Sequence, residues 1–283
     1  MLRWLDVRLE NESRKGTDLN MASKKRDLSI PWPFAPAKVD LNTDTNLLKI
    51  VAMIAMFIDH AGKMLFPEYR IMRVIGRIAF PIYAYCIAVG SVYTKDPLKY
   101  LTRIVFLALI SQPLYAIALN HESQLMYTYS FADQPVRAAL GFYLHSWTKP
   151  SILVSLTLGI MVIWTIRERR LILTLALAVL CWKIQGSLDY GLRGIILMVL
   201  FYLFSFNRMI SFPVVFCYML WWAMQGSGYT LFDVQFGIQI FAMLSLALIY
   251  IRTKSGIRLN KWVFYLFYPA HLIAIMLLMR FAV

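Results

Sequence analysis

The chain has 283 residues, of which 60% are hydrophobic and only 16% are charged. A soluble domain is about 45–50% apolar, and a single soluble core of this size could not bury so much apolar surface. The composition excludes an ordinary cytosolic enzyme, a disordered chain and a disulfide-stapled secreted domain. It predicts a polytopic membrane protein in contact with the lipid bilayer.

The net charge is +14, from 29 basic and 15 acidic side chains. This excess is typical of cytoplasmic loops that face anionic lipid. No basic patch is interleaved with aromatic residues, so no nucleic-acid partner is expected. The cysteines Cys86, Cys181 and Cys217 each lie in an apolar run, without a CxxC or a His/Cys cluster. Neither a disulfide framework nor a metal site is predicted.

The chain divides into a polar cytoplasmic tail, residues 1–45, and a multi-pass transmembrane domain, residues 46–283. The tail holds eight Lys/Arg and seven acids and lacks the apolar core of a signal peptide. After it, apolar runs alternate with polar breaks and predict an all-α transmembrane bundle of about nine spans. These spans are expected at 47–66, 76–94, 99–119, 151–166, 170–184, 190–206, 210–224, 234–251 and 262–281.

The basic residues in the breaks predict the orientation, because cytoplasmic loops carry the excess of positive charge. With the N-terminus inside, the inner segments hold 19 Lys/Arg and the outer segments hold 8. This bias and the odd number of spans place the N-terminus inside and the C-terminus outside. The longest connection, 120–150, then lies outside, and its run Ala138–Trp147 is too short to span and could lie in the interface or re-enter.

Ionisable residues within apolar spans are costly in lipid and by default indicate function. Asp59 and His60 lie toward the outer end of the first span; the alternative is a structural pair of Asp59 with Lys63. Adjacent helical residues point about 100° apart, so at least one of the two must find a partner on another helix. Arg73 and Arg77, on one helical face, predict a clamp for a phosphate or carboxylate, with snorkelling to the interface as the alternative.

Two further polar positions interrupt the later spans. His271 lies in the last span, two residues after Pro269 and close to Tyr268. A neutral imidazole is suited to general-base work, although a lone histidine on an apolar face is often a core residue. Asp189 and Tyr190 open the sixth span, where the acid either contributes to a site or caps the helix.

Four segments, in this order, resemble the TraX family: LLKIVAMIAMFIDHAGKMLF, RVIGRIAFPIYAY, DYGLRG and FYLFYPAHLIAIMLL. This family of membrane proteins is named after the enzyme that acetylates the N-terminus of F-type conjugative pilin. The resemblance covers residues 47–281. Its pattern falls on Asp59, His60, Gly62, Arg73, Gly76, Arg77, Phe80, Pro81, Asp189, Tyr190, Gly191, Tyr268, Pro269 and His271.

The resemblance implies an integral-membrane acyltransferase of the bacterial cytoplasmic (inner) membrane, distantly similar to transporter-like acyltransferases that use cytosolic acetyl-CoA. The expected acceptor is an amine or hydroxyl of a pilin-like protein or a glycan. Such transfer needs a base for the acceptor and donors for the developing oxyanion. His60 or His271 would be the base, and Asp59 would orient an imidazole across the gap between helices, with His271 the preferred partner.

Binding roles are expected on both sides of the membrane. Acceptor binding is expected at Arg73, Arg77, Asp189, Tyr190, Tyr268 and Ser155, and binding of acetyl-CoA at the inner cations Arg103, Arg167, Arg170 and Arg252. Two other functions could use the same fold. One is a non-catalytic pilus or envelope assembly factor, and the other is a proton-coupled transporter with Asp59 and His60 as its relay. The sequence lacks the inverted repeat of many transporters, which argues against the latter.

Overall fold

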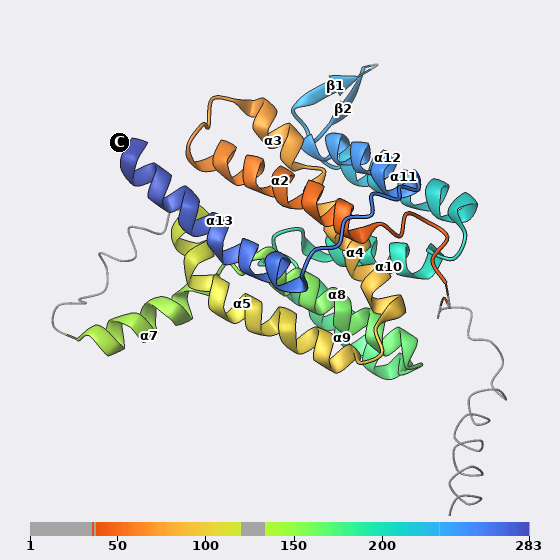
Figure 1. Ribbon diagram of the computed structural model, residues 1–283, viewed down its shortest axis with the longest axis horizontal. Coiled ribbons are helices and arrows are strands. Elements are labelled where there is room, and N and C mark those ends of the chain that lie inside the picture. The colour runs from red at the N-terminus through yellow and green to blue at the C-terminus, as the bar shows by residue number, and fades with distance from the viewer. Residues whose placement is uncertain (1–35, 37, 120–133, 232, 283) are drawn as a thin grey trace, which may run out of the picture. The chain divides into compact units, whose positions relative to one another are not determined.

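The computed structural model describes residues 36, 38–119, 134–231 and 233–282 (Figure 1). Residues 1–35, most of the expected tail, lie outside these ranges. So do residues 120–133, the first part of the long connection predicted on the outer side.

Helices account for nearly all of the described secondary structure, as the sequence predicts. In chain order they are α2 (Thr45–Met64), α3 (Arg70–Gly76), α4 (Ala79–Tyr93), α5 (Pro97–Leu119), α7 (Pro135–Ser146), α8 (Ile152–Arg167), α9 (Leu171–Ile184), α10 (Gly191–Phe204), α11 (Arg208–Met224), the 3₁₀ helix η1 (Ile238–Leu244), α12 (Ser245–Tyr250) and α13 (Lys261–Ala282). An antiparallel hairpin, β1 (Tyr229–Leu231) and β2 (Val234–Phe236), precedes η1.

Each of the nine predicted apolar segments contains a helix or parts of two successive helices, so the all-α prediction is confirmed. Three helical stretches within the described ranges are long and apolar enough to cross a membrane: Arg70–Tyr93, Pro97–Leu119 and Lys261–Phe281. The apolar helices α8, α9 and α10 have 16, 14 and 14 residues, fewer than the roughly 20 that a full crossing needs. The apolar helices place the protein in a membrane, and a ninefold crossing stays a prediction.

Two predicted boundaries differ from the structure. The second span begins earlier, at Arg70, and is broken between α3 and α4 at Arg77 and Ile78. Pro81, a residue that often kinks a helix, lies instead in the first turn of α4, where a missing N–H removes no hydrogen bond. In the eighth segment, residues 234–236 pair in the hairpin, and helical structure begins only at Ile238.

Helix α4 forms the centre of the bundle. It contacts α2, α8, α10 and α12, and most of its residues on every face are buried, as expected for a helix that is apolar all round. The peripheral helix α9 instead buries only Leu177 and Cys181 and leaves apolar side chains such as Ile172 exposed. An exposed apolar face of this kind is suited to lipid.

Residues 38–44, the end of the expected polar tail, pack onto the bundle. Val39, Leu41 and Asn42 are buried. The hydroxyl of Tyr85 donates to the carbonyl of Asn42 at 2.6 Å, and the Asn42 side chain donates to the carbonyl of Leu248 at 2.9 Å. The segment thus ties α4 to α12 ahead of the first long helix.

Candidate functional site

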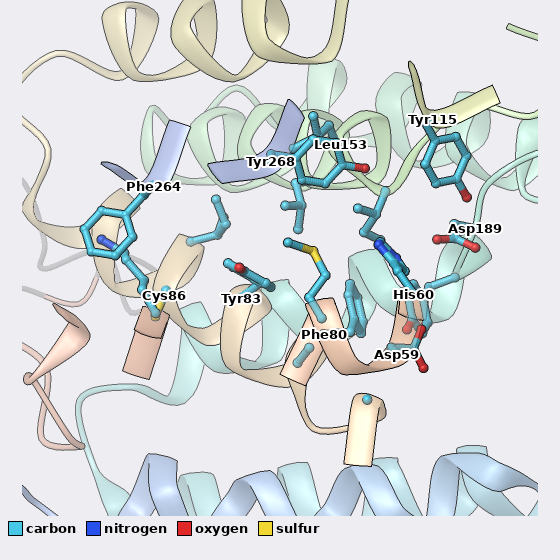
Figure 2. Close-up of a pocket in the computed structure, with 18 of the residues that line it drawn as sticks. Asp59, His60, Phe80, Tyr83, Cys86, Tyr115, Leu153, Asp189, Phe264 and Tyr268 are labelled. Carbon is cyan, nitrogen blue, oxygen red and sulfur yellow. The ribbon is translucent and has the colours of Figure 1, made fainter. Parts of the chain in front are cut away.

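A cavity of about 280 Å³ lies within the bundle, and residues of α2, α3, α4, α5, α8 and α13 line it. Its two ends differ in chemistry. Figure 2 shows Asp59, His60 and Asp189 at one end and Phe264 at the other, with apolar and tyrosine side chains between them. The first end, here called the polar end, is lined by Asp59, His60, Lys63, Arg73, Arg77 and Asp189.

The opposite end, here called the lysine end, is formed by Lys49 and Lys261 with Phe264 and Tyr265. The Nζ atom of Lys49 lies 5.1 Å from the centre of the Phe264 ring, in a cation–π contact. Lys49 and His60 both lie on α2, eleven positions apart, which corresponds to about 16 Å along a helix axis. Lys49 and His60 are therefore separated by about half the length of α2, which has 20 residues.

The carboxylate of Asp59 is held by two arginines, a group here called the carboxylate clamp. Nη1 of Arg73 lies 2.7 Å from Oδ2 of Asp59, and Nη2 of Arg77 lies 2.8 Å from Oδ1. Asp59 and Arg77 are 8% and 9% exposed. Arg73 and Arg77 thus clamp a carboxylate of the chain itself, and the expected binding of an anionic acceptor by these arginines stays a prediction.

A close contact between α2 and α3 positions the clamp. At Gly76, a side-chain Cβ would lie 2.2 Å from Cβ of Asp59, so only glycine lets α3 approach α2 this closely. Lys63, the alternative partner of Asp59, turns away. Its Nζ atom donates to the carbonyl of Leu119 at the end of α5, at 2.6 Å.

His60 pairs with His271. Nδ1 of His60 lies 2.8 Å from Nε2 of His271, and the two rings stack with centres 5.1 Å apart. Nδ1 of His271 lies 3.0 Å from the carbonyl oxygen of Phe267, one turn earlier in α13. The expected pairing of Asp59 with His271 is therefore wrong. Both Asp59 and His60 find partners on other helices, but the partners of Asp59 are arginines and the partner of His271 is His60.

Aromatic residues and an unpaired hydroxyl complete the walls. The ring of Tyr190 stacks on Phe80 with centres 3.9 Å apart, and the edge of Trp222 faces both. Tyr268 lines the cavity, and its buried hydroxyl has no hydrogen-bond partner among the described residues. A buried hydroxyl in this position is available to a ligand or to water. The Ser155 hydroxyl is also unpaired within the described chain, but Ser155 does not line the cavity.

None of the four arginines expected to bind acetyl-CoA lines this cavity within the described ranges. Nη1 of Arg167 donates to the carbonyls of Ser91 and Thr94, both at 2.9 Å, and thereby holds the α4–α5 connection. Arg252 pairs with the Asp40 carboxylate. Arg170 precedes α9 on the surface, and Arg103 lies on α5 away from the cavity wall.

The lysines of the cavity were missed by the sequence analysis. Lys49 stands in the same apolar run as Asp59 and satisfies the same criterion, an ionisable residue within a span. Lys261 gave no comparable signal, since it lies just before the last predicted span as one of several basic residues in 252–261. Tyr83 and Tyr115 also line the cavity and were not distinguishable from core aromatic residues.

Comparisons with known proteins agree with the resemblance. A probable fimbrial assembly protein, FimC of serogroup H1, from Dichelobacter nodosus is 24% identical over 247 residues, which are 80% of this chain and 91% of that protein. An uncharacterised protein of Rickettsia prowazekii (strain Madrid E) is 46% identical over 67 residues, 24% of this chain and 25% of the relative. No solved structure matches. The family described as TraX protein matches residues 44–279, and the chain therefore belongs to the TraX family.

Proposed function

We propose that this protein is a membrane acyltransferase that moves an acetyl group from acetyl-CoA to an amine or hydroxyl of an envelope acceptor such as a pilin-like protein. The observation that carries the proposal is the cavity, with an imidazole at its polar end and, at its other end, two lysines that form no ion pair with any described residue. The family name and the fimbrial assembly relative support an acceptor related to pili.

The lysine end has the chemistry to bind the donor. Coenzyme A is a phosphorylated nucleotide with a long, narrow arm that carries the thioester. Lys49 and Lys261 provide two positive charges for phosphates. No carboxylate of the described residues lies within ion-pairing distance of either lysine. The apolar middle of the cavity accepts the arm, and the thioester then reaches the polar end.

The predicted orientation agrees with this arrangement. With the N-terminus in the cytoplasm, Lys49 and Lys261 begin their helices on the cytoplasmic side, where acetyl-CoA is available. His60 lies near the other end of α2, toward the predicted outer side. The acceptor would approach from that side.

The transfer balances with the groups present at the polar end. His60 takes a proton from the acceptor amine or hydroxyl as that atom attacks the acetyl carbonyl carbon. Nearby cations and hydroxyls stabilise the oxyanion that forms. The carbon–sulfur bond then breaks, and the departing CoA thiolate takes the proton from His60 to leave acetylated acceptor and free CoA.

A second candidate is a non-catalytic assembly factor that binds pilin subunits in the membrane, which the name of the fimbrial relative favours. The two functions differ in one measurement. The full chain in nanodiscs is mixed with acetyl-CoA labelled in the acetyl group and a synthetic peptide that has a free amino terminus and the first residues of a pilin-like protein. Acyl transfer predicts labelled peptide and one free CoA for each acetyl group moved.

Matched lysine variants identify the donor site. We expect Lys49→Gln or Lys261→Gln to raise KM for acetyl-CoA by about tenfold, the loss of one charge-assisted contact, with a smaller effect on kcat. Lys254→Gln, an exposed lysine outside the cavity, is the control and should behave as the parent protein. Absence of acetyl-CoA binding to the parent protein would refute the proposal, and binding of acetyl-CoA without transfer would favour the assembly factor.

A further inference from the structure

The two histidines are arranged so that only one of their nitrogen atoms is left for chemistry. The carbonyl oxygen of Phe267 can only accept a hydrogen bond, so Nδ1 of His271 must carry a proton. In a neutral imidazole the other nitrogen, Nε2, is then an acceptor. That acceptor lies 2.8 Å from Nδ1 of His60, so Nδ1 of His60 is the donor. Nε2 of His60 therefore has a free lone pair.

The surroundings hold His271 in this role. His271 is 3% exposed and does not line the cavity, whereas His60 does. The Phe267 ring stacks on the His271 ring with centres 5.1 Å apart and planes 7° apart, and Tyr268 meets it edge-on at 5.4 Å. The aromatic contacts fix the ring, and the Phe267 carbonyl fixes its tautomer. Nε2 of His60 forms no hydrogen bond with any described residue.

We infer that His271 is a positioning residue that keeps His60 in the Nδ1–H tautomer, so that Nε2 of His60 faces the cavity as the proton acceptor of the reaction. The inference rests on the proposed acyl transfer and assigns one task to each histidine. After His60 has taken the acceptor proton at Nε2, its Nδ1–H still donates to Nε2 of His271. His271, whose ring is oriented by the Phe267 carbonyl, thus orients His60 in the way that an aspartate orients the catalytic histidine of serine hydrolases.

The 2.8 Å contact also limits the charge of the pair. A hydrogen bond between two ring nitrogens needs one lone pair, so the pair holds at most one extra proton. Without His271, the His60 ring is free to place its proton on Nε2 or to turn away. Either change removes the lone pair from the position where the acceptor proton leaves.

The tautomers can be measured without any substrate. In full-length protein labelled with ¹⁵N-histidine in nanodiscs at neutral pH, we expect His60 and His271 both to carry their proton on Nδ1. Signals are assigned by loss in single histidine variants, and His145, outside the cavity, is the internal reference. A proton on Nε2 of His60 would overturn the inference whether or not the protein transfers acetyl groups.

Kinetics separate positioning from packing. His271→Gln keeps a side-chain oxygen that can accept the Nδ1–H of His60, whereas His271→Ala removes the acceptor. We expect kcat to fall by about 10²-fold or more in His271→Ala, to return largely in His271→Gln, and KM for acetyl-CoA to change little in both. His145→Ala should match the parent protein.

The outcomes distinguish the positioning role of His271 from the proposed acyl transfer. An active parent protein with a fully active His271→Ala variant would overturn the positioning role and leave acyl transfer standing. A parent protein that transfers no acetyl group would contradict the proposed function, while the tautomer measurement still decides the arrangement of the pair. If His271→Ala does not fold, recovery in His271→Gln and the ¹⁵N spectrum decide the question.

Discussion

Gly76→Ala tests whether the close approach of α3 to α2 creates the carboxylate clamp. The substitution adds one methyl group and changes no charge. The new Cβ would lie 2.2 Å from both Cβ and Oδ1 of Asp59. Both neighbours are close to the α2 backbone, so rotation of a side chain alone cannot relieve the overlap.

The size of the effect follows from these distances. Carbon atoms in contact lie about 3.5–4.0 Å apart, so the 2.2 Å separation requires the helices to move apart by about 1.3 Å or more. A shift of that size stretches the 2.8 Å contact between Arg77 and Asp59 toward 4 Å, about the limit of an ion pair. Overpacking costs about 1–3 kcal/mol, and each hydrogen bond to a charged group that is lost costs about 1.5–3 kcal/mol more.

We therefore expect Gly76→Ala to lower the melting temperature in detergent and to reduce acetyl transfer, although every polar group of the site is still present. Gly186→Ala is the matched control, because a Cβ there would meet no atom of the described residues within 4 Å. A Gly76→Ala protein as stable and as active as the parent would show that the spacing of α2 and α3 is not what holds Asp59.

Three further predictions concern charge and topology. Asp59→Asn leaves two arginines without their carboxylate and should lower the free energy of unfolding by about 3–5 kcal/mol; equal unfolding curves in mixed micelles would contradict a structural role for the clamp. A phosphatase fused after Val283 should be active outside the membrane, and one fused before Met1 should be inactive. The reverse pattern would place the polar end of the cavity on the cytoplasmic side. The Ser255 N–H donates to the Asp44 carboxylate, which lies outside the helices and whose pKa is thereby lowered. The contact thus stabilises the fold above about pH 4 and is lost as the pH falls through the lowered pKa. The protection factor of the Ser255 amide, which compares its exchange with the intrinsic rate at the same pH, should therefore fall there, and an unchanged protection factor at pH 2 would oppose this.

The helices were predictable because lipid-facing and core-facing segments are both apolar over their length. The break between α3 and α4 was not, because residues 74–80 contain no signal that distinguishes a turn at Arg77 from a continuous helix. It depends on the packing of Gly76 against α2. Similarly, Val234 and Phe236 are as apolar as the helix that follows, so their pairing in a hairpin is a tertiary property.

The candidate site was likewise predictable in its residues but not in their contacts. Its charged members could be found from the sequence, since Asp59, His60, Arg73 and His271 are ionisable residues in apolar segments. Their pairing could not, because it depends on the rotation and height of each helix. The short connection between α2 and α3 folds α3 back along α2 and brings the arginines to Asp59, which leaves His60 to meet α13.

Three basic residues near the polar end contradict the charge rule for loops. Lys63, Arg73 and Arg77 lie on the predicted outer side, where positive charge is unfavoured, yet each has an internal partner. The charged residues that line the polar end comprise these three cations and two anions, Asp59 and Asp189. The balance is one positive charge beside an imidazole whose Nε2 is free. Positive charge fixed in a site stabilises an oxyanion as it forms, which is what the proposed acyl transfer requires. The outer cations are therefore better explained by the chemistry proposed for the cavity than by the insertion of the helices.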